Sequence, residues 1–297
     1  MKHFTIVADT SCDLPPEYLK EHGIELLEIP FTLDGAEKNN QEISDKAFYN
    51  ALRNGSLAKT SLINPDMFVE SFTEYAKQGQ DTLCIILSSG LSATYQSSQI
   101  ALAQVKEPYP DCNIYPMDSI GATSVNGLLV MLAVKKREEG LSAEETAAWL
   151  EEKKNSLLGF FTVDDLMYLH RGGRLSKLSA IGGSLLSIKP VLNIQPDGTL
   201  ALKNKTRGRA AALRLLVSQL KRSITPDAKL DTVLIPHTDC EKDALKLAEL
   251  VKAEINVRQV IITMMGPVIG AHVGPGAVAV VFEGDMTREA YEEKFYK

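Results

Sequence analysis

The chain has 297 residues, 44% of them hydrophobic, and a formal net charge of −6, so one large or two medium domains can each bury a core and no basic field attracts nucleic acid. Its longest uncharged apolar segments fall short of the ~20 residues that a membrane-spanning helix needs. The N-terminus enters a strand pattern at once, without the apolar stretch of a signal peptide, and we expect a cytoplasmic protein with no stable membrane insertion.

The first half of the chain alternates apolar runs with amphipathic helix patterns, which is typical of an α/β architecture. Asn64 is expected to cap a helix that has Pro65 as its first residue, and Ser142 with Glu145 forms the capping-box pattern of another. Cys84 lies in an apolar strand pattern, where a buried inert thiol is expected. Strands are predicted over residues 4–9, 23–33, 82–87 and 112–119, and helices over 13–23, 43–55, 64–79, 99–107, 123–140 and 142–157.

The pattern changes near residue 157, where a strand leads into a helix whose start fits a Thr162/Asp165 capping box. A hairpin is predicted around Pro196, which indicates a mixed sheet rather than an all-parallel one. We therefore expect a mostly parallel sheet in an N-terminal domain, residues 1–157, and a mixed sheet in a C-terminal domain, residues 158–297. Further strands are predicted over residues 231–237, 258–265 and 276–284, and a helix over 241–254.

The stretch SSGLSATYQSS, residues 88–98, places seven hydroxyl side chains around one glycine where a strand gives way to a helix. In open α/β sheets such turns are where ligands bind, because the first amides of a helix have no partner within it. Ser92 is expected near the N-cap, and Gly90 lets backbone approach closely, so the turn could hold an anionic group. A serine that only caps its own helix is the simpler interpretation, and both remain open.

Two further polar segments could join this turn. Thr60 and Ser61 precede the helix that Asn64 caps, which leaves their hydroxyls free to bind a ligand. His272 lies in GPVIGAHVGPGAVAVVF, on an expected bend between two apolar runs. There it either meets an anionic ligand or bonds a neighbouring carbonyl, and the sequence favours neither.

Other polar groups give weaker patterns. Arg171 and Arg174 flank a glycine pair and could clamp a carboxylate or phosphate, or bind the last carbonyls of the preceding helix. Thr238 and Glu241 predict a helix cap, so a structural role is preferred for His237. The sequence contains no phosphate-binding glycine loop, and its four cysteines are too far apart for a metal site.

An enzymatic interpretation rests on the segment Gly90 to Thr94, which resembles the GxSxG turn of serine hydrolases with Thr94 in place of the second glycine. The order Ser92 then His272 suits such an enzyme, but no acid stands out as the third member. A hydrolase that acts on a lipid ester is therefore the alternative to a binding protein.

Six segments in this order resemble the DegV family, over roughly residues 4–284: IVADTSCDLP, KTS, SSGLSATYQS, the Asp118-Ser119 pair, YLHRGGRLS and GPVIGAHVGPGAVAV. The resemblance implies two α/β domains with a long-chain fatty acid between them. Some members are the acyl-binding subunit of bacterial fatty acid kinase and present the carboxylate to a separate kinase. By this resemblance the chain is a lipid-binding protein and not an enzyme, has a possible kinase partner, and uses neither cofactor nor metal.

The same resemblance implies roles for single residues. Thr60 and Ser92 would be the carboxylate ligands, with the backbone near Ala93 assisting. His272 would lie close to the head group, and Arg171 near the same mouth.

Arg207 matches a basic segment that is tied to kinase docking in such subunits. The chain departs from the family pattern at two places. The family often has Gly where Ala93 stands, and Gln-Pro where Leu62 and Ile63 stand, so backbone approach and the loop after Ser61 can differ.

A fatty-acid site needs an apolar slot that ends in hydrogen-bond donors. Burying a chain of ~16 carbons, as in palmitate, offers on the order of 12 kcal/mol at about 0.8 kcal/mol per methylene. The carboxylate must be paired, because an isolated buried charge is too costly. The small residues of SAIGGSLLSI, 179–188, could line this slot or could reflect close helix packing.

Overall fold

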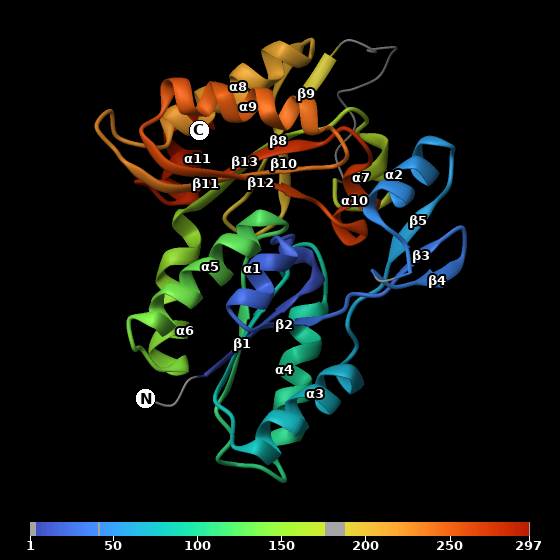
Figure 1. Cartoon of the computed structure of the whole chain (residues 1–297), viewed down its shortest axis with the longest axis vertical. Coiled ribbons are helices and arrows are strands. Elements are labelled where there is room, and N and C mark those ends of the chain that lie inside the picture. Colours follow the sequence, from blue (N-terminus) through green and yellow to red (C-terminus); the bar gives the residue numbers. More distant parts are fainter. Residues whose placement is uncertain (1–3, 41, 176–187, 297) are drawn as a thin grey trace.

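The computed structural model describes residues 4–40, 42–175 and 188–296, and its strands form three sheets (Figure 1). Most of the expected slot segment, residues 179–187, lies outside the described residues. The mixed α/β class predicted from the sequence is confirmed, with a parallel sheet in the N-terminal half and a mixed sheet in the C-terminal half.

The first sheet has four strands, and each neighbouring pair is parallel. Helices cover both faces, because alternate residues of β1 point to opposite sides: Ile6 packs towards α5, and Val7 towards α3 and α4. The strands in sheet order are β2 (Ile24–Leu27), β1 (Thr5–Asp9), β6 (Thr82–Ile86) and β7 (Ile114–Asp118). The helices are η1 (Thr10–Cys12), α1 (Pro16–Glu21), α3 (Pro65–Gln78), α4 (Thr94–Lys106), α5 (Ser124–Glu138), α6 (Ala143–Lys153) and η2 (Lys154–Ser156).

The second large sheet has six strands, of which β11 and β12 pair in parallel and the other described pairs are antiparallel. The predicted hairpin is present, since β9 and β10 pair across the turn at residues 195–199. The strands in sheet order are β10 (Leu200–Arg207), β9 (Ile188–Ile194), β8 (Leu157–Thr162), β13 (Val278–Glu283), β11 (Leu230–His237) and β12 (Val257–Met264). Its helices are α7 (Met167–Arg171), α8 (Arg209–Arg222), α9 (Glu241–Glu254), α10 (Pro267–Val273) and α11 (Arg288–Tyr296).

Helix α5 lies between the two large sheets (Figure 1). Its buried residues pack against Ile6 and Leu83 of the parallel sheet and against Leu234 and Val281 of the mixed sheet. Each such fully buried aliphatic side chain contributes about 1.5–3 kcal/mol. The expected domain boundary, between residues 157 and 158, falls after the first residue of β8 and stays a prediction.

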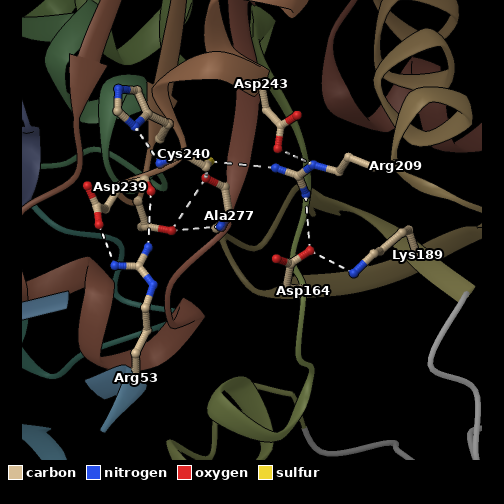
Figure 2. A network of polar contacts seen from close by, with 10 residues as sticks. Arg53, Asp164, Lys189, Arg209, Asp239, Cys240, Asp243 and Ala277 are labelled. Atoms are coloured by element: carbon tan, nitrogen blue, oxygen red, sulfur yellow. Dashed lines mark hydrogen bonds and ion pairs between the residues drawn. The ribbon is translucent and has the colours of Figure 1, made fainter. Parts of the chain in front are cut away.

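A small lobe stands beside the mixed sheet, at the right of Figure 1. It is an antiparallel sheet with helix α2 packed on it, and Tyr49 of α2 donates a hydrogen bond of 2.5 Å to the Met265 carbonyl. Arg53, the last residue of α2, binds the side chain of Asp239 and its carbonyl oxygen (Figure 2). These contacts hold the lobe, and hence Thr60 at its end, against α10. The lobe consists of β4 (Ala36–Lys38), β3 (Phe31–Leu33), β5 (Ala58–Thr60) and α2 (Asp45–Arg53).

Two of the five predicted helix caps are confirmed. Asn64 accepts a hydrogen bond of 3.0 Å from the Met67 amide, and Ser142 and Glu145 form a reciprocal capping box. The caps predicted at Thr162, Thr238 and Ser92 are wrong.

Thr162 is the last residue of β8, paired with Val278, and α7 begins later, at Met167. Thr238 donates instead to the Gly274 carbonyl at 2.7 Å, and α9 has Cys240 as its N-cap.

Candidate functional site

In the serine-rich turn after β6, some residues stabilise the fold and another lines the candidate site. Ser88 is buried and donates to the Gly198 carbonyl at 3.0 Å. A Cβ on Gly90 would lie 2.6 Å from the carbonyl oxygen of Asp197, so the glycine is needed for the close approach of the β9–β10 turn. The turn therefore joins the two halves of the chain.

Ser92 is not the N-cap that the sequence suggested, because α4 begins at Thr94 and Ala93 precedes it as N-cap. The Ser92 hydroxyl lies 2.9 Å from the Thr94 hydroxyl and accepts a weak bond from the Thr94 amide. The hydroxyls of Ser97 and Ser98 donate to carbonyls within their own helix. Of these three serines, Ser92 faces a cavity.

This cavity lies between the two large sheets and has about 810 Å³ of space, its open part included. Its walls come from the ends of β5 and β6, the start of α5, the inner faces of β8, β9, β10 and β13, and helix α10. Among the described lining residues the polar ones are Thr60, Ser61, Ser92, Thr123, Arg174 and His272, and the others are apolar or glycine.

Three of these polar residues, Thr60, Arg174 and His272, act on one another. Thr60 Oγ1 lies 2.8 Å from His272 Nε2. Arg174 donates from Nε to the Leu91 carbonyl at 2.8 Å, next to Ser92, and its charge acts on His272. Thr60, the His272 imidazole and the Arg174 guanidinium therefore lie close together, and Ser92 follows the residue that Arg174 binds.

His272 lies on helix α10, and the expectation that it sits on a bend is wrong. Burial, and secondly the charge of Arg174, lower its pKa from 6.5 to about 4, so the imidazole is neutral at pH 7. Its Nδ1 has no hydrogen-bond partner among the described residues. A Cβ on residue 172 would overlap Nδ1 of His272. Glycine at this position therefore leaves room for the imidazole.

The lowered pKa of His272 predicts that the stability of the fold depends on pH. Because the folded pKa is below the unfolded value of 6.5, His272 contributes stability above pH 6.5, and the contribution is lost as pH falls towards 4. Between pH 7 and pH 5 the wild type should lose about 2 kcal/mol more unfolding free energy than His272→Gln. Urea unfolding at both pH values measures this difference, and equal losses in the two proteins would contradict it.

The other predicted residues lie around this end. Ser61 lines the cavity, whereas Ala93 is not among its lining residues. Arg171 is exposed and lines a neighbouring outer pocket, which shares Thr60, Arg174 and His272 with the inner cavity.

Sequence reasoning missed Thr123, which gave no motif, and preferred Arg171 to Arg174 as the cation near the head group. Gly173 has a φ of +71° and turns the chain, and Arg174 then lines the inner cavity while Arg171 does not. Arg207 is exposed at the end of the edge strand β10.

The geometry does not favour a serine hydrolase. The partner of Ser92 Oγ is Thr94, and that of His272 Nε2 is Thr60, so neither atom bonds the other. With Nδ1 unpartnered, no acid orients the imidazole among the described residues.

Among the residues that the structure describes, no group of three or more His, Cys, Asp or Glu side chains could hold a metal ion. Every described helix is too short or too polar to span a bilayer.

A family model described as "Uncharacterised protein, DegV family" matches residues 3–285. The chain belongs to the DegV family. A DegV domain-containing protein of Clostridium perfringens, CPE0026, is 42% identical over 96% of this chain and 99% of its own length.

Solved DegV structures share this fold. A DegV lipid binding protein of Thermotoga maritima, TM1468, is 30% identical over 97% of this chain and 100% of its own, with a TM-score of 0.83. A second protein of that organism, TM841, whose structure is described as revealing a fatty acid binding function, is 29% identical over 96% of this chain and 100% of its own, with a TM-score of 0.83.

Proposed function

We propose that this DegV protein binds a long-chain fatty acid in the cavity between its two halves. The observation that carries the proposal is a mostly apolar cavity in which Thr60, His272 and Arg174 lie close together. The two Thermotoga relatives, described as lipid binding and fatty acid binding, support it. An acyl chain of ~16 carbons would contribute on the order of 12 kcal/mol of gross burial energy along the apolar walls.

The carboxylate would lie at the polar end, where it needs donors and a positive charge. Neutral His272 can donate from Nε2 to Thr60 Oγ1, which leaves the Thr60 hydroxyl proton free for a carboxylate oxygen. Ser92 can use its hydroxyl proton in the same way when both the hydroxyl and the amide of Thr94 donate to it. Arg174 would supply the charge. Ser61, the backbone near Ala93 and, at the outer pocket, Arg171 complete the proposed site.

The test compares two serines of the same turn. Ser92→Ala should lower fatty-acid affinity about tenfold, since one hydrogen bond to a charged group is worth about 1.5–3 kcal/mol. Ser98→Ala is the matched control, because Ser98 is buried and donates to the Tyr95 carbonyl within its helix. Native mass spectrometry of the purified proteins measures the co-purified lipid. No fatty acid on the wild type, or equal lipid on both variants, would refute the proposal.

We further propose that the bound carboxylate is presented to a separate fatty acid kinase. The outer pocket supports this, because it reaches the polar residues of the cavity from the surface. Arg207, exposed on β10, would belong to the docking surface. Arg207→Ala should lower acyl-phosphate formation at limiting protein concentration and leave fatty-acid affinity unchanged. Equal turnover by both proteins would exclude this role.

A further inference from the structure

Asp13 connects the two halves of the chain at a point outside the proposed carboxylate site. It follows η1 with a φ of +50°, a conformation that is uncommon for a side chain other than glycine. Its Oδ1 accepts a hydrogen bond of 2.8 Å from the amide of Gly266, in the other half of the chain. The proposed function gives this half-buried residue no role.

Gly266 is the residue from which helix α10 begins. It is the N-cap of the helix, and its neighbour Met265 accepts the hydrogen bond of Tyr49 at 2.5 Å. Both anchors of the helix start, Asp13 and Tyr49, thus come from the N-terminal half. The helix they hold carries His272 and three further cavity-lining residues.

The same carboxyl also meets the start of α5. The hydroxyl of Thr123, the N-cap residue of α5, lowers the pKa of Asp13, while burial has the larger, opposite effect and raises it well above its ordinary value. Neither Oδ2 of Asp13 nor the Thr123 hydroxyl has a hydrogen-bond partner among the described residues, so Thr123 acts on the carboxyl without bonding it. Thr123 is itself a lining residue of the cavity. One carboxyl therefore binds the start of α10 and acts on the start of α5, and both helices line the cavity.

We propose that Asp13 is a positioning residue of this cavity: its carboxyl fixes the start of α10 relative to α5 and thereby holds His272 against Thr60. The inference rests on the proposed fatty-acid site. His272 lies six residues beyond Gly266, about 9 Å along the helix. A tilt that moves His272 by ~1 Å would lengthen its contact with Thr60, now 2.8 Å, beyond hydrogen-bond distance.

The experiment compares Asp13→Ala with Asp13→Asn. Alanine leaves the Gly266 amide without an acceptor, whereas asparagine keeps an oxygen in the Oδ1 position and adds a donor beside Thr123. Leu150→Ala is the control for general destabilisation, because Leu150 is fully buried on α6, far from α10 along the chain and in a different cluster. The first readout is the imidazole ¹⁵N and ¹H spectrum of His272 in delipidated protein. The second is the affinity for a fluorescent long-chain fatty acid.

We expect Asp13→Ala to shift the His272 imidazole signals and to weaken fatty-acid binding about tenfold at a temperature where it is folded. Asp13→Asn should restore the signals and bring the affinity within about twofold of wild type, and Leu150→Ala should leave the signals unchanged. Unchanged His272 signals in Asp13→Ala, or the same shift in Leu150→Ala, would overturn the proposal. The spectrum tests Asp13 even if the wild type binds no fatty acid, so failure of the fatty-acid function is a separate result.

Discussion

Replacing Arg174 by glutamine is expected to weaken fatty-acid binding by at least about 30-fold. Arg174 is the charged side chain among the described residues that line the inner cavity, and a carboxylate there would lose its counter-charge. Removing one member of such a buried charged pair costs about 2–5 kcal/mol. Because the charge of Arg174 also lowers the pKa of His272, that pKa should rise above about 4 in the variant. Competition binding measures the loss of fatty-acid affinity, and an NMR titration of His272 measures the rise of its pKa.

The matched control is Arg171→Gln. Arg171 carries the same charge only three residues away, but it is exposed, lines the outer pocket and stacks on the Tyr168 ring at 4.7 Å. Its loss should change affinity less than about threefold, as expected for an exposed charge. If the two variants bind fatty acid equally well, Arg174 is not the counter-charge of the carboxylate.

Replacing Arg288 by methionine is expected to destabilise the fold by about 4 kcal/mol. Arg288 is 2% exposed and donates to three backbone carbonyls, those of Leu157 at 2.9 Å, Ile120 and Gln195. Its guanidinium is so enclosed that burial lowers its pKa to about 10. Methionine fills part of the space but leaves the carbonyls without donors, and each buried unsatisfied group costs about 1–3 kcal/mol.

Urea unfolding followed by tryptophan fluorescence measures this effect. Arg222→Met is the control, since Arg222 is exposed on α8 and surface substitutions usually change stability by no more than about 0.5 kcal/mol. Equal unfolding free energies for the two variants would show that the three carbonyl contacts of Arg288 add nothing to stability.

The sequence predicts local structure well where the chemistry is local. Asn64 caps α3 and Ser142 caps α6 because donor and acceptor lie within three residues of each other. The Thr238 cap failed because a distant carbonyl, that of Gly274, takes its hydroxyl. The Thr162 cap failed because pairing with β13 keeps that residue in a strand. In both cases a tertiary contact outweighed a correct local pattern.

The site was harder to predict, for a geometric reason. The sequence could name Thr60, Ser92 and His272, because hydroxyls before helices and a histidine among glycines are visible as patterns. It could not show that His272 is helical. Gly270, which suggested a bend, is needed instead because a Cβ there would come within 2.5 Å of the Tyr49 hydroxyl. Because these residues are far apart in the chain, the spacing of residue types along the sequence does not predict such a contact.

The placement of α5 between two sheets bears on how a ligand can be admitted. Many two-domain binding proteins close by rotation about a hinge. Here such a rotation would slide one of the two sheets across the helix, breaking the apolar contacts on that side. We expect the two halves to stay together while smaller segments around the cavity yield. The cavity walls are then in place before the lipid binds, so little of the binding free energy is used to close the cavity.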